Sequence, residues 1–253
     1  MENKSKNRVI AASFRPSLVI KVLVFAYLTL LMLHGAVLFI AHGLGYDVAM
    51  GVVPLFHFDV EQNVPTQYTG LLMLSIVILL VFTALIEQRL SAGAQIPWLF
   101  LAVGFALMFG DEMFTFHELV ADIVVNNVQV SGAFAFGWVI PYLALVALLG
   151  LVLAPWFFRL DRWSQIWFAA SGSIYLLGAI GTEMIAGVYI SGLAEDRETW
   201  RTLTGDLLAT LEESMEIIGL SLFLLTLVRR LDRNGYVLSL SLAGRDEENV
   251  PKA

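Results

Sequence analysis

Long apolar segments recur along this chain, and shorter polar segments separate them. Several of the apolar segments come near to or exceed the roughly 18 to 20 residues that an α-helix needs to cross a membrane. Their hydropathy predicts six transmembrane helices, at residues 18–41, 68–86, 96–119, 133–157, 165–190 and 204–228. The predicted fold class is therefore all-α, a polytopic membrane helical bundle.

Composition agrees with a membrane protein and excludes several kinds of chemistry. Hydrophobic residues make up 58% of the 253-residue chain, and its mean hydropathy is +0.77. The chain has no cysteine, so disulfides, thiolate metal ligands and iron–sulfur clusters are excluded. The net charge of −7 says little about partners, because the distribution of Lys and Arg matters more in a membrane protein than their total. No nucleic-acid partner is expected.

The apolar segments divide the chain into three parts. Residues 1–17 form an N-terminal arm, residues 18–230 form the six-helix transmembrane domain, and residues 231–253 form a polar tail that we expect to be unstructured. The first apolar run is far longer than the ~7 to 15 residues of a signal-peptide core. We therefore interpret it as a transmembrane helix.

Charged residues in the loops predict the orientation of the chain. One set of loops carries the basic residues Lys4, Lys6, Arg8, Arg15, Arg89, Arg159, Arg162, Arg229, Arg230 and Arg233. The opposite loops are mainly acidic and carry Asp47, Asp59, Glu61, Asp122, Glu195, Asp196 and Glu198, with Arg197 and Arg201 as their basic residues. Since Lys and Arg concentrate in cytoplasmic loops, both the N-terminal arm and the C-terminal tail are expected to be cytoplasmic.

Ionisable side chains lie inside the predicted helices, where lipid-facing positions would be apolar. They are His34, Asp111, Glu112, His117, Glu118, Glu183, Asp206, Glu212, Glu213 and Glu216. No Lys or Arg lies in the central stretches of these helices. Because each buried charge costs about 2.5 to 3.5 kcal/mol on insertion scales, such a group of acids persists only if it is protonated, hydrated or bound to a cation.

Depth and facing predict that these side chains meet. At ~1.5 Å per residue, Asp111 and Glu213 both lie about 22 Å from the cytoplasmic ends of their helices, and Glu183 and His34 lie at a similar depth. On a continuous third helix, Asp111, Glu118 and Asp122 share one face with Thr115. Thr202, Asp206, Glu213 and Glu216 form a comparable stripe on the sixth helix, with Glu212 one turn before Glu216.

The remaining positions suggest which helices surround the acids. The second and fourth predicted helices contain no ionisable residue, so we expect them to face lipid outside the other four. Small residues of the fifth helix, Gly172, Ala179 and Gly187, lie along one side and are expected to bring Glu183 close to its neighbours. Metal sites formed by carboxylates occur in the cores of such bundles.

The two acidic motifs resemble those of a known group of proteins. D-E-x4-H-E (Asp111, Glu112, His117, Glu118) in one helix and E-E-x-x-E (Glu212, Glu213, Glu216) followed by Gly219 in the last helix are similar to motifs of uncharacterised bacterial multi-pass inner-membrane proteins. The resemblance covers the third to sixth helices and implies a common fold and a common site in the bacterial inner (cytoplasmic) membrane. Paired E-x-x-H motifs, which ferritin-type di-iron proteins use, are missing from the sequence.

A divalent cation site is the leading hypothesis for the acids. Carboxylates with histidines favour iron, manganese or zinc over calcium or magnesium. The expected metal ligands are Glu118, Glu183, Glu213, Glu216 and His117, then Asp111 and His34, with Glu112 and Glu212 in the same group. Such a site predicts a metal-dependent membrane enzyme, either an oxidoreductase or a hydrolase acting on a lipid-soluble substrate. No catalytic residue is assigned.

Two other classes of function remain open. Protonatable acids could instead serve a proton- or cation-coupled transporter or channel. The chain could also be a non-catalytic accessory subunit of a larger membrane complex, with membrane lipids and other subunits as its partners. Interhelical hydrogen bonds average only about 0.6 kcal/mol, so a purely structural role explains the number of acids poorly.

Several polar residues have simpler interpretations. His42 is expected to be a hydrogen-bonded helix residue, and Asp206 an interfacial one near a helix start. His57, Asp59 and Glu61 share one face of an extended segment. We interpret that segment as a solvated loop, with a cap over the acids or a second cation position as the alternatives.

Overall fold

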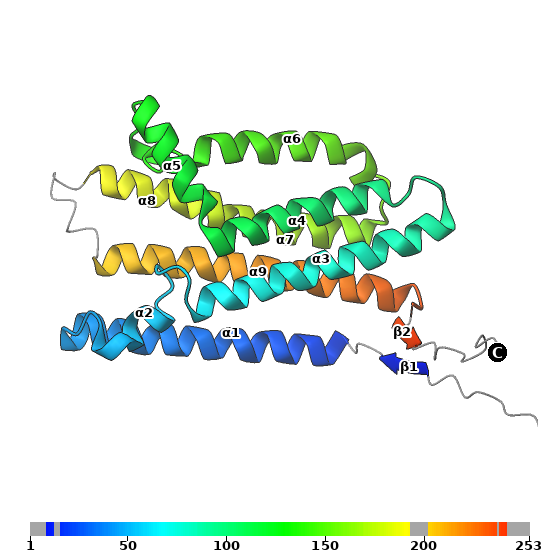
Figure 1. The fold of residues 1–253 in the computed structure, drawn as a ribbon, viewed down its shortest axis with the longest axis horizontal. Helices are drawn as coiled ribbons and strands as arrows, with labels where there is room; N and C mark the ends of the chain where they lie inside the picture. The colour runs from blue at the N-terminus through cyan, green and yellow to red at the C-terminus, as the bar shows by residue number, and fades with distance from the viewer. Residues whose placement is uncertain (1–8, 13–15, 193–201, 237, 242–253) are drawn as a thin grey trace, which may run out of the picture.

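The computed structural model describes residues 9–12, 16–192, 202–236 and 238–241. Within these ranges the long helices lie side by side along one shared direction (Figure 1). The elements in chain order are β1 (Val9–Ala12), α1 (Pro16–Leu38), the π-helical η1 (Phe39–Gly43), the 3-10 helix η2 (Ala49–Gly51), α2 (Val52–Phe56), α3 (Val64–Leu90), α4 (Ile96–Phe114), α5 (Phe116–Asn127), the 3-10 helix η3 (Gly132–Phe134), α6 (Val139–Phe157), α7 (Arg162–Leu176), the π-helical η4 (Leu177–Thr182), α8 (Glu183–Ser191), α9 (Leu203–Arg233) and β2 (Leu238–Ser241).

Five helices are long and apolar enough to cross a membrane. They are α1 continued through η1, α3, α4, α6, and the helix formed by α7, η4 and α8. The chain is therefore a helical membrane protein. The sixth predicted segment corresponds to α9, whose 31 residues extend roughly 46 Å at ~1.5 Å per residue but carry many charged side chains.

Polar side chains at the helix starts explain where three of these helices begin. Asn63 accepts a hydrogen bond from the Thr66 N–H at the start of α3, and Asp161 accepts one from the Ser164 N–H at the start of α7. Thr202 caps α9 in the same way. Each cap satisfies a backbone N–H that has no partner within its helix.

Helix α9 lies at the centre of the bundle, where α1, α3, α7 and η4 pack around it. The core forms along α3 and α9, whose apolar residues recur three or four positions apart. Its most buried members include Met73, Ile76, Leu80, Ile217, Leu220 and Leu227. A thick apolar block therefore occupies the middle of the molecule.

The central place of α3 contradicts the prediction that the second helix faces lipid. Buried residues occur along its whole length, from Pro65 to Ala84. Helix α6, the fourth predicted helix, does face outward, and Val139 is its only buried residue. The absence of ionisable residues cannot distinguish a central helix such as α3 from an outer one such as α6, because apolar side chains suit a protein core as well as lipid.

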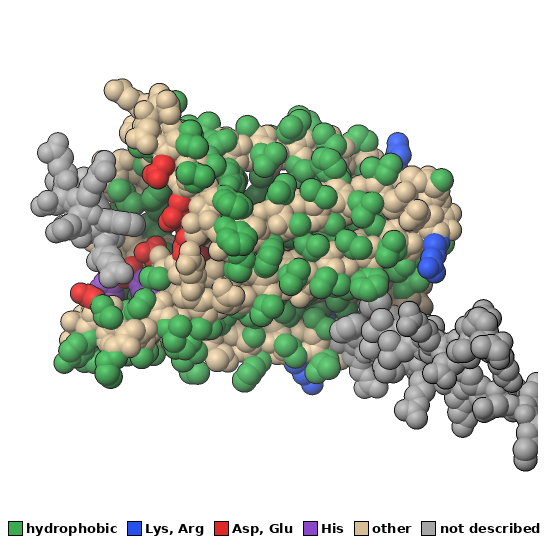
Figure 2. All heavy atoms as spheres, in the orientation of Figure 1, with side chains coloured by type: hydrophobic (Ala, Val, Ile, Leu, Met, Phe, Trp, Pro, Cys, Tyr) green, Lys and Arg blue, Asp and Glu red, His purple; other side chains and the backbone are tan. Residues whose placement is uncertain are grey.

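The outer surface of the bundle is apolar. Phe25 and Leu151 have about three quarters of their surface exposed, at 75% and 74%. Figure 2 shows apolar side chains over most of one face, with acidic and histidine side chains gathered at one end and basic ones mainly toward the other. We call these the acidic end and the basic end. An apolar surface of this kind is suited to lipid.

The third predicted helix is broken at Thr115. Its backbone has φ +53° and ψ +41°, the left-handed conformation, so α4 ends at Phe114 and α5 starts at Phe116 in another direction (Figure 1). The predicted helix 96–119 is therefore wrong at its end. A β-branched residue rarely adopts this conformation, which is why the sequence does not reveal the break.

A short strand before α1 and another after α9 pair at the basic end. Strands β1 and β2 pair antiparallel, with Val9 opposite Ser241 and Ala12 opposite Leu238. The prediction of an unstructured tail is therefore wrong for residues 238–241. The loop with Glu195, Asp196, Arg197, Glu198 and Arg201, and the basic residues Lys4, Lys6, Arg8 and Arg15, lie outside the described residues.

Two glycines let α7, η4 and α9 approach closely. A Cβ on Gly219 would lie 2.7 Å from the backbone nitrogen of Tyr175, and one on Gly178 would lie 2.9 Å from the Cβ of Met215. Small residues allow this kind of contact between membrane helices. Gly172, which the sequence suggested for this role, is surrounded by open space, and a Cβ on it would meet no atom within 4 Å.

Gly219→Ala should destabilise the protein by about 1 to 3 kcal/mol, because the added methyl group meets backbone atoms of the neighbouring helix. Gly172→Ala is the matched control, since open space surrounds it and Ala favours a helix by about 0.5 to 1 kcal/mol over Gly. Thermal unfolding in detergent measures both variants. Equal unfolding temperatures for the two variants would contradict the close packing.

Candidate metal centre and buried carboxylates

The segment between α1 and α3 is held against the bundle by His34. The Phe58 N–H donates to His34 Nδ1 at 3.1 Å, and the two rings stack with centroids 4.1 Å apart. Because Nδ1 accepts, the ring proton lies on Nε2, which donates to Thr210 Oγ1 at 2.8 Å. His34 is 1% exposed, and both of its ring nitrogens are occupied in this arrangement. It therefore positions the segment and has no nitrogen available for a metal.

Asn63 gives the same segment its shape. Its side-chain N–H groups donate to the carbonyl oxygens of Pro54 at 3.0 Å and of His57 at 2.6 Å. His57 is thereby buried, with 8% of its surface exposed, and the interpretation of this segment as a solvated loop is wrong at His57. Burial of polar groups is tolerated here because each backbone group named has a hydrogen-bond partner.

Two histidines converge on one carboxylate at the start of α9. His42 Nε2 lies 2.6 Å from Asp206 Oδ2, and His57 Nε2 lies 3.5 Å from the same oxygen. Asp206 is 5% exposed. His42 belongs to the π-helical η1, a conformation that recurs at functional sites. The prediction that His42 is a hydrogen-bonded helix residue is confirmed, and its partner is the residue we interpreted as interfacial.

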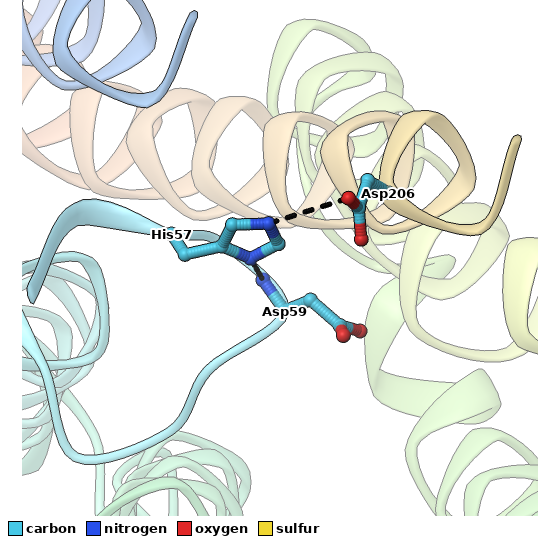
Figure 3. Close-up of side chains that lie close together, drawn as sticks. All are labelled: His57, Asp59 and Asp206. Atoms are coloured by element: carbon cyan, nitrogen blue, oxygen red, sulfur yellow. Dashed lines mark hydrogen bonds and ion pairs between the residues drawn. The ribbon is translucent and has the colours of Figure 1, made fainter. Parts of the chain in front are cut away.

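Asp59 completes a group that could hold a metal ion. Ligand atoms of His57, Asp59 and Asp206 all lie within 4.8 Å of one another (Figure 3). A cavity of about 40 Å³ adjoins them, lined in part by His42, His57 and Asp206. This volume suits one ion with a water molecule and is too small for an organic substrate. Imidazole and carboxylate ligands are suited to zinc, iron or manganese.

The hydrogen bonds of His57 indicate which ring nitrogen carries the proton, and this proton would have to move if a metal bound at Nε2. Its Nδ1 accepts from the Asp59 N–H at 3.2 Å, which places the ring proton on Nε2, facing Asp206. A metal bound at Nε2 requires the proton on Nδ1 instead. A metal at Nε2 would therefore require loss of the hydrogen bond from the Asp59 N–H to Nδ1.

A second group surrounds His117, just beyond the break at Thr115. Asp111 accepts hydrogen bonds from the His117 backbone N–H at 2.7 Å and from the Tyr142 hydroxyl at 2.9 Å. The His117 ring lies between two carboxylates, with Nδ1 3.3 Å from Asp111 Oδ2 and Nε2 3.1 Å from Glu61 Oε1. Burial by itself lowers the pKa of this imidazole, but the hydrogen bonds to Asp111 and Glu61 outweigh burial and raise its pKa from 6.5 to about 10.

No Lys or Arg lies in the central stretches of the predicted helices, but a protonated His117 supplies a positive charge next to the acids. The positive imidazolium offsets the negative charges of Asp111 and Glu61, and each of its two ring nitrogens contacts one of these carboxylates. The sequence placed His117 and Asp111 among the metal ligands, and the structure does bring them together. Glu61 joins them from the segment between α2 and α3, which consists of turns and bends and is not extended as predicted.

Five glutamates form a third group deeper in the bundle. They are Glu112 on α4, Glu183 at the start of α8, and Glu212, Glu213 and Glu216 on α9, and they interact electrostatically with one another. Glu183 Oε1 accepts from the Trp138 indole N–H at 3.2 Å. Among the described residues, none of the five forms an ion pair with Lys or Arg. The predicted convergence of these glutamates is therefore present in the structure.

The segment between α2 and α3 connects the candidate metal group with the glutamates. Asp59 interacts electrostatically with both Glu183 and Glu213, so its carboxylate lies near the glutamate group as well as near His57 and Asp206. Glu183 directly follows the π-helical η4, as His42 lies in η1. The acidic end is thus one continuous polar layer formed by α1, the segment after it, α4, α5, α8 and α9.

Glu118 and Asp122 do not join this layer. Both side chains are exposed on α5. The sequence placed them on one stripe with Asp111 by assuming a continuous helix, and the turn at Thr115 removes that alignment. The sequence analysis interprets His57 and Asp59 as residues of a solvated loop and Asp206 as an interfacial residue, because acids are common in loops and at helix starts. The spacing of His57, Asp59 and Glu61 was the one signal that pointed to them.

Fold and site together define a polytopic helical membrane protein with a buried layer of histidines and carboxylates. The family model described as domain of unknown function (DUF8692) matches residues 21–231, and the chain belongs to this family. Searches of curated proteins and of solved structures returned no match.

The stabilisation from His117 should depend on pH in a defined direction. Because its pKa in the folded protein lies above 6.5, the stabilisation is fully present below pH 6.5 and is lost as the pH rises toward 10. The difference in unfolding temperature between the native protein and His117→Gln should therefore shrink from pH 6 to pH 10. Asp122→Asn, on the exposed face of the same helix, should show no such trend. A difference that stays constant with pH would show that His117 is not a buried cation.

Proposed function

We propose that this protein is a metal-dependent enzyme of the bacterial inner membrane, acting on a lipid-soluble substrate. The observation that carries the proposal is the convergence of His57, Asp59 and Asp206, with His42 2.6 Å from Asp206, beside glutamates that no Lys or Arg balances among the described residues. We assign His42, His57, Asp59 and Asp206 as the ligands of one divalent cation. Sequence reasoning had placed the metal among the glutamates instead.

The orientation we propose has six membrane crossings, with α9 as the sixth and both termini cytoplasmic. The distribution of arginines supports it, because Arg89 lies in the last turn of α3, Arg159 and Arg162 lie between α6 and α7, and Arg230 and Arg233 lie in the last turn of α9. The metal group then lies near the periplasmic surface. Neighbouring helices cover the acidic side chains of α9, which lets a helix of this charge cross the membrane.

The metal and the glutamates have separate roles in this proposal. Zinc at the site would activate water for hydrolysis of a lipid or peptide bond, whereas iron or manganese would support oxidation of a substrate such as a quinone. Glu183, Glu213 and the other glutamates would accept and release protons next to the reacting groups. A lipid-soluble substrate would approach from the bilayer along the apolar outer surface and would meet the metal at the mouth of the small cavity, which is too small to enclose it.

The apolar core favours an enzyme over a transporter. Toward the basic end from Glu216, the core includes Leu72, Met73, Ile76, Leu220 and Leu224, and the polar atoms buried among them, those of Tyr68, Thr69 and Ser221, belong to uncharged side chains. A proton or cation path needs polar groups or water along its length. The polar layer therefore connects to one side of the molecule in this conformation.

Metal binding by point variants tests the proposal. Protein purified in detergent, stripped with a chelator and equilibrated with zinc, iron or manganese should retain one ion per chain, measured by elemental analysis. Asp206→Asn and His57→Gln should each lower the affinity at least about 100-fold, because each removes a ligand. Asp122→Asn should bind as the native protein does. Native protein that binds none of the three metals, or Asp206→Asn that binds normally, would overturn the assignment.

Vesicle experiments distinguish the other two functions. Metal-free protein that carries protons or sodium across reconstituted vesicles would support a transporter, and the flux should then disappear in Glu213→Gln. Metal-free protein without flux that copurifies with other membrane proteins would support an accessory subunit. An intact metal site without flux is the result that the enzyme proposal requires.

A further inference from the structure

A cavity of about 820 Å³ opens at the basic end of the bundle. Its walls come from the end of α3, the loop before α4, the turn between α6 and α7, and the last turn of α9. The volume falls in the roughly 300 to 1,000 Å³ range of small-molecule sites. None of the residues assigned to the metal centre or to the glutamate group lines it, so the cavity is separate from the acidic end.

Arg230 connects the parts of the cavity wall that come from α3, α7 and α9. Its guanidinium donates to Asp161 Oδ2 at 2.9 Å, to Ser164 Oγ at 3.0 Å and to Glu87 Oε1 at 3.2 Å. It also lies 5.2 Å from the centre of the Trp98 ring. Both carboxylates that line the cavity are thus paired with this one arginine, which has a structural role.

Two further arginines give the cavity an excess of positive charge. Arg159 and Arg233 line it together with Arg230, so three arginines face two carboxylates and the lining has a net charge of +1. Within the described part of the chain, neither Arg159 nor Arg233 lies within 4.0 Å of a carboxylate oxygen, and Arg233 interacts with Asp161 only at longer range. Arg233 instead lies 4.5 Å over the Trp163 ring. Planar guanidinium groups bind phosphate oxygens in pairs, which makes them suited to a phosphate ligand.

The surroundings of the cavity suit the headgroup region of a membrane. Trp98, Trp156 and Trp163 all line it, and tryptophans concentrate where a bilayer meets water. The adjoining side chains of Ile96 and Phe158 are apolar and exposed, at 62% and 73%.

We propose that this cavity binds the phosphate headgroup of an anionic phospholipid, with Arg159 and Arg233 as its phosphate ligands. Basic pockets between transmembrane helices are a known means of binding such headgroups. A lipid fits better than a soluble phosphate compound because its acyl chains can cover Ile96 and Phe158. The lipid would join α3, α7 and α9 at the basic end. The inference is independent of any metal at the acidic end.

Lipid titration of the purified full chain tests this site. In a neutral detergent, short-chain phosphatidylglycerol should change the tryptophan fluorescence and bind more tightly than phosphatidylcholine of the same chain length. Arg159→Gln should weaken phosphatidylglycerol binding about tenfold, and Arg159→Gln with Arg233→Gln should weaken it further. Arg89→Gln is the matched control, because Arg89 is exposed at the same end but does not line the cavity.

Three results would overturn the proposal. Equal affinities for the two lipids would show that the phosphate charge is not recognised. Equal losses in Arg159→Gln and Arg89→Gln would place lipid binding outside the cavity. Glycerol phosphate that binds as tightly as phosphatidylglycerol would identify a site for soluble phosphate compounds. Unfolding temperatures of all variants, measured without lipid, check that Arg159→Gln and Arg89→Gln fold equally well.

Discussion

Carboxylates inside a membrane helix are stable only when other helices cover them, and this requirement organises the bundle. Helix α9 carries Asp206, Glu212, Glu213 and Glu216, and α1, α3, α7 and η4 pack around it. Gly178 and Gly219 permit the closest of these contacts. The same packing that covers α9 directs Glu212, Glu213 and Glu216 toward Glu112 and Glu183. Fold stability and site formation therefore depend on the same helix.

The segment between α1 and α3 completes the polar layer, and buried hydrogen bonds rather than helix packing determine its position. His34 binds the Phe58 N–H, and Asn63 binds the carbonyl oxygen of His57. These bonds hold His57 and Asp59 beside Asp206, which belongs to a helix far away in the sequence. A buried polar group without such partners costs about 1 to 3 kcal/mol, so the segment has few alternative positions.

The apolar block of α3 and α9 separates two polar regions with different chemistry. At the acidic end, histidines and carboxylates form the proposed metal site and the glutamate group beside it, and the His117 ring lies between two carboxylates. At the basic end, Arg230 pairs with Glu87 and Asp161 and leaves Arg159 and Arg233 for an anion. The separation explains how one small bundle can hold a reactive centre on one side and a lipid contact on the other.

The sequence by itself determined that the chain forms long apolar helices and that acids interrupt some of them, because the cost of placing charge in lipid leaves a one-dimensional pattern of apolar runs interrupted by acids. It could therefore predict that Glu112, Glu183, Glu212, Glu213 and Glu216 converge. Only the tertiary structure decided which apolar helix is central, because lipid and protein core favour the same residues. It also decided the turn at Thr115, which removed Glu118 from the site, and the pairing of His57 with Asp206 across nearly 150 residues. Such contacts depend on backbone conformation and on hydrogen bonds between distant segments, and neither leaves a periodic signal along the chain.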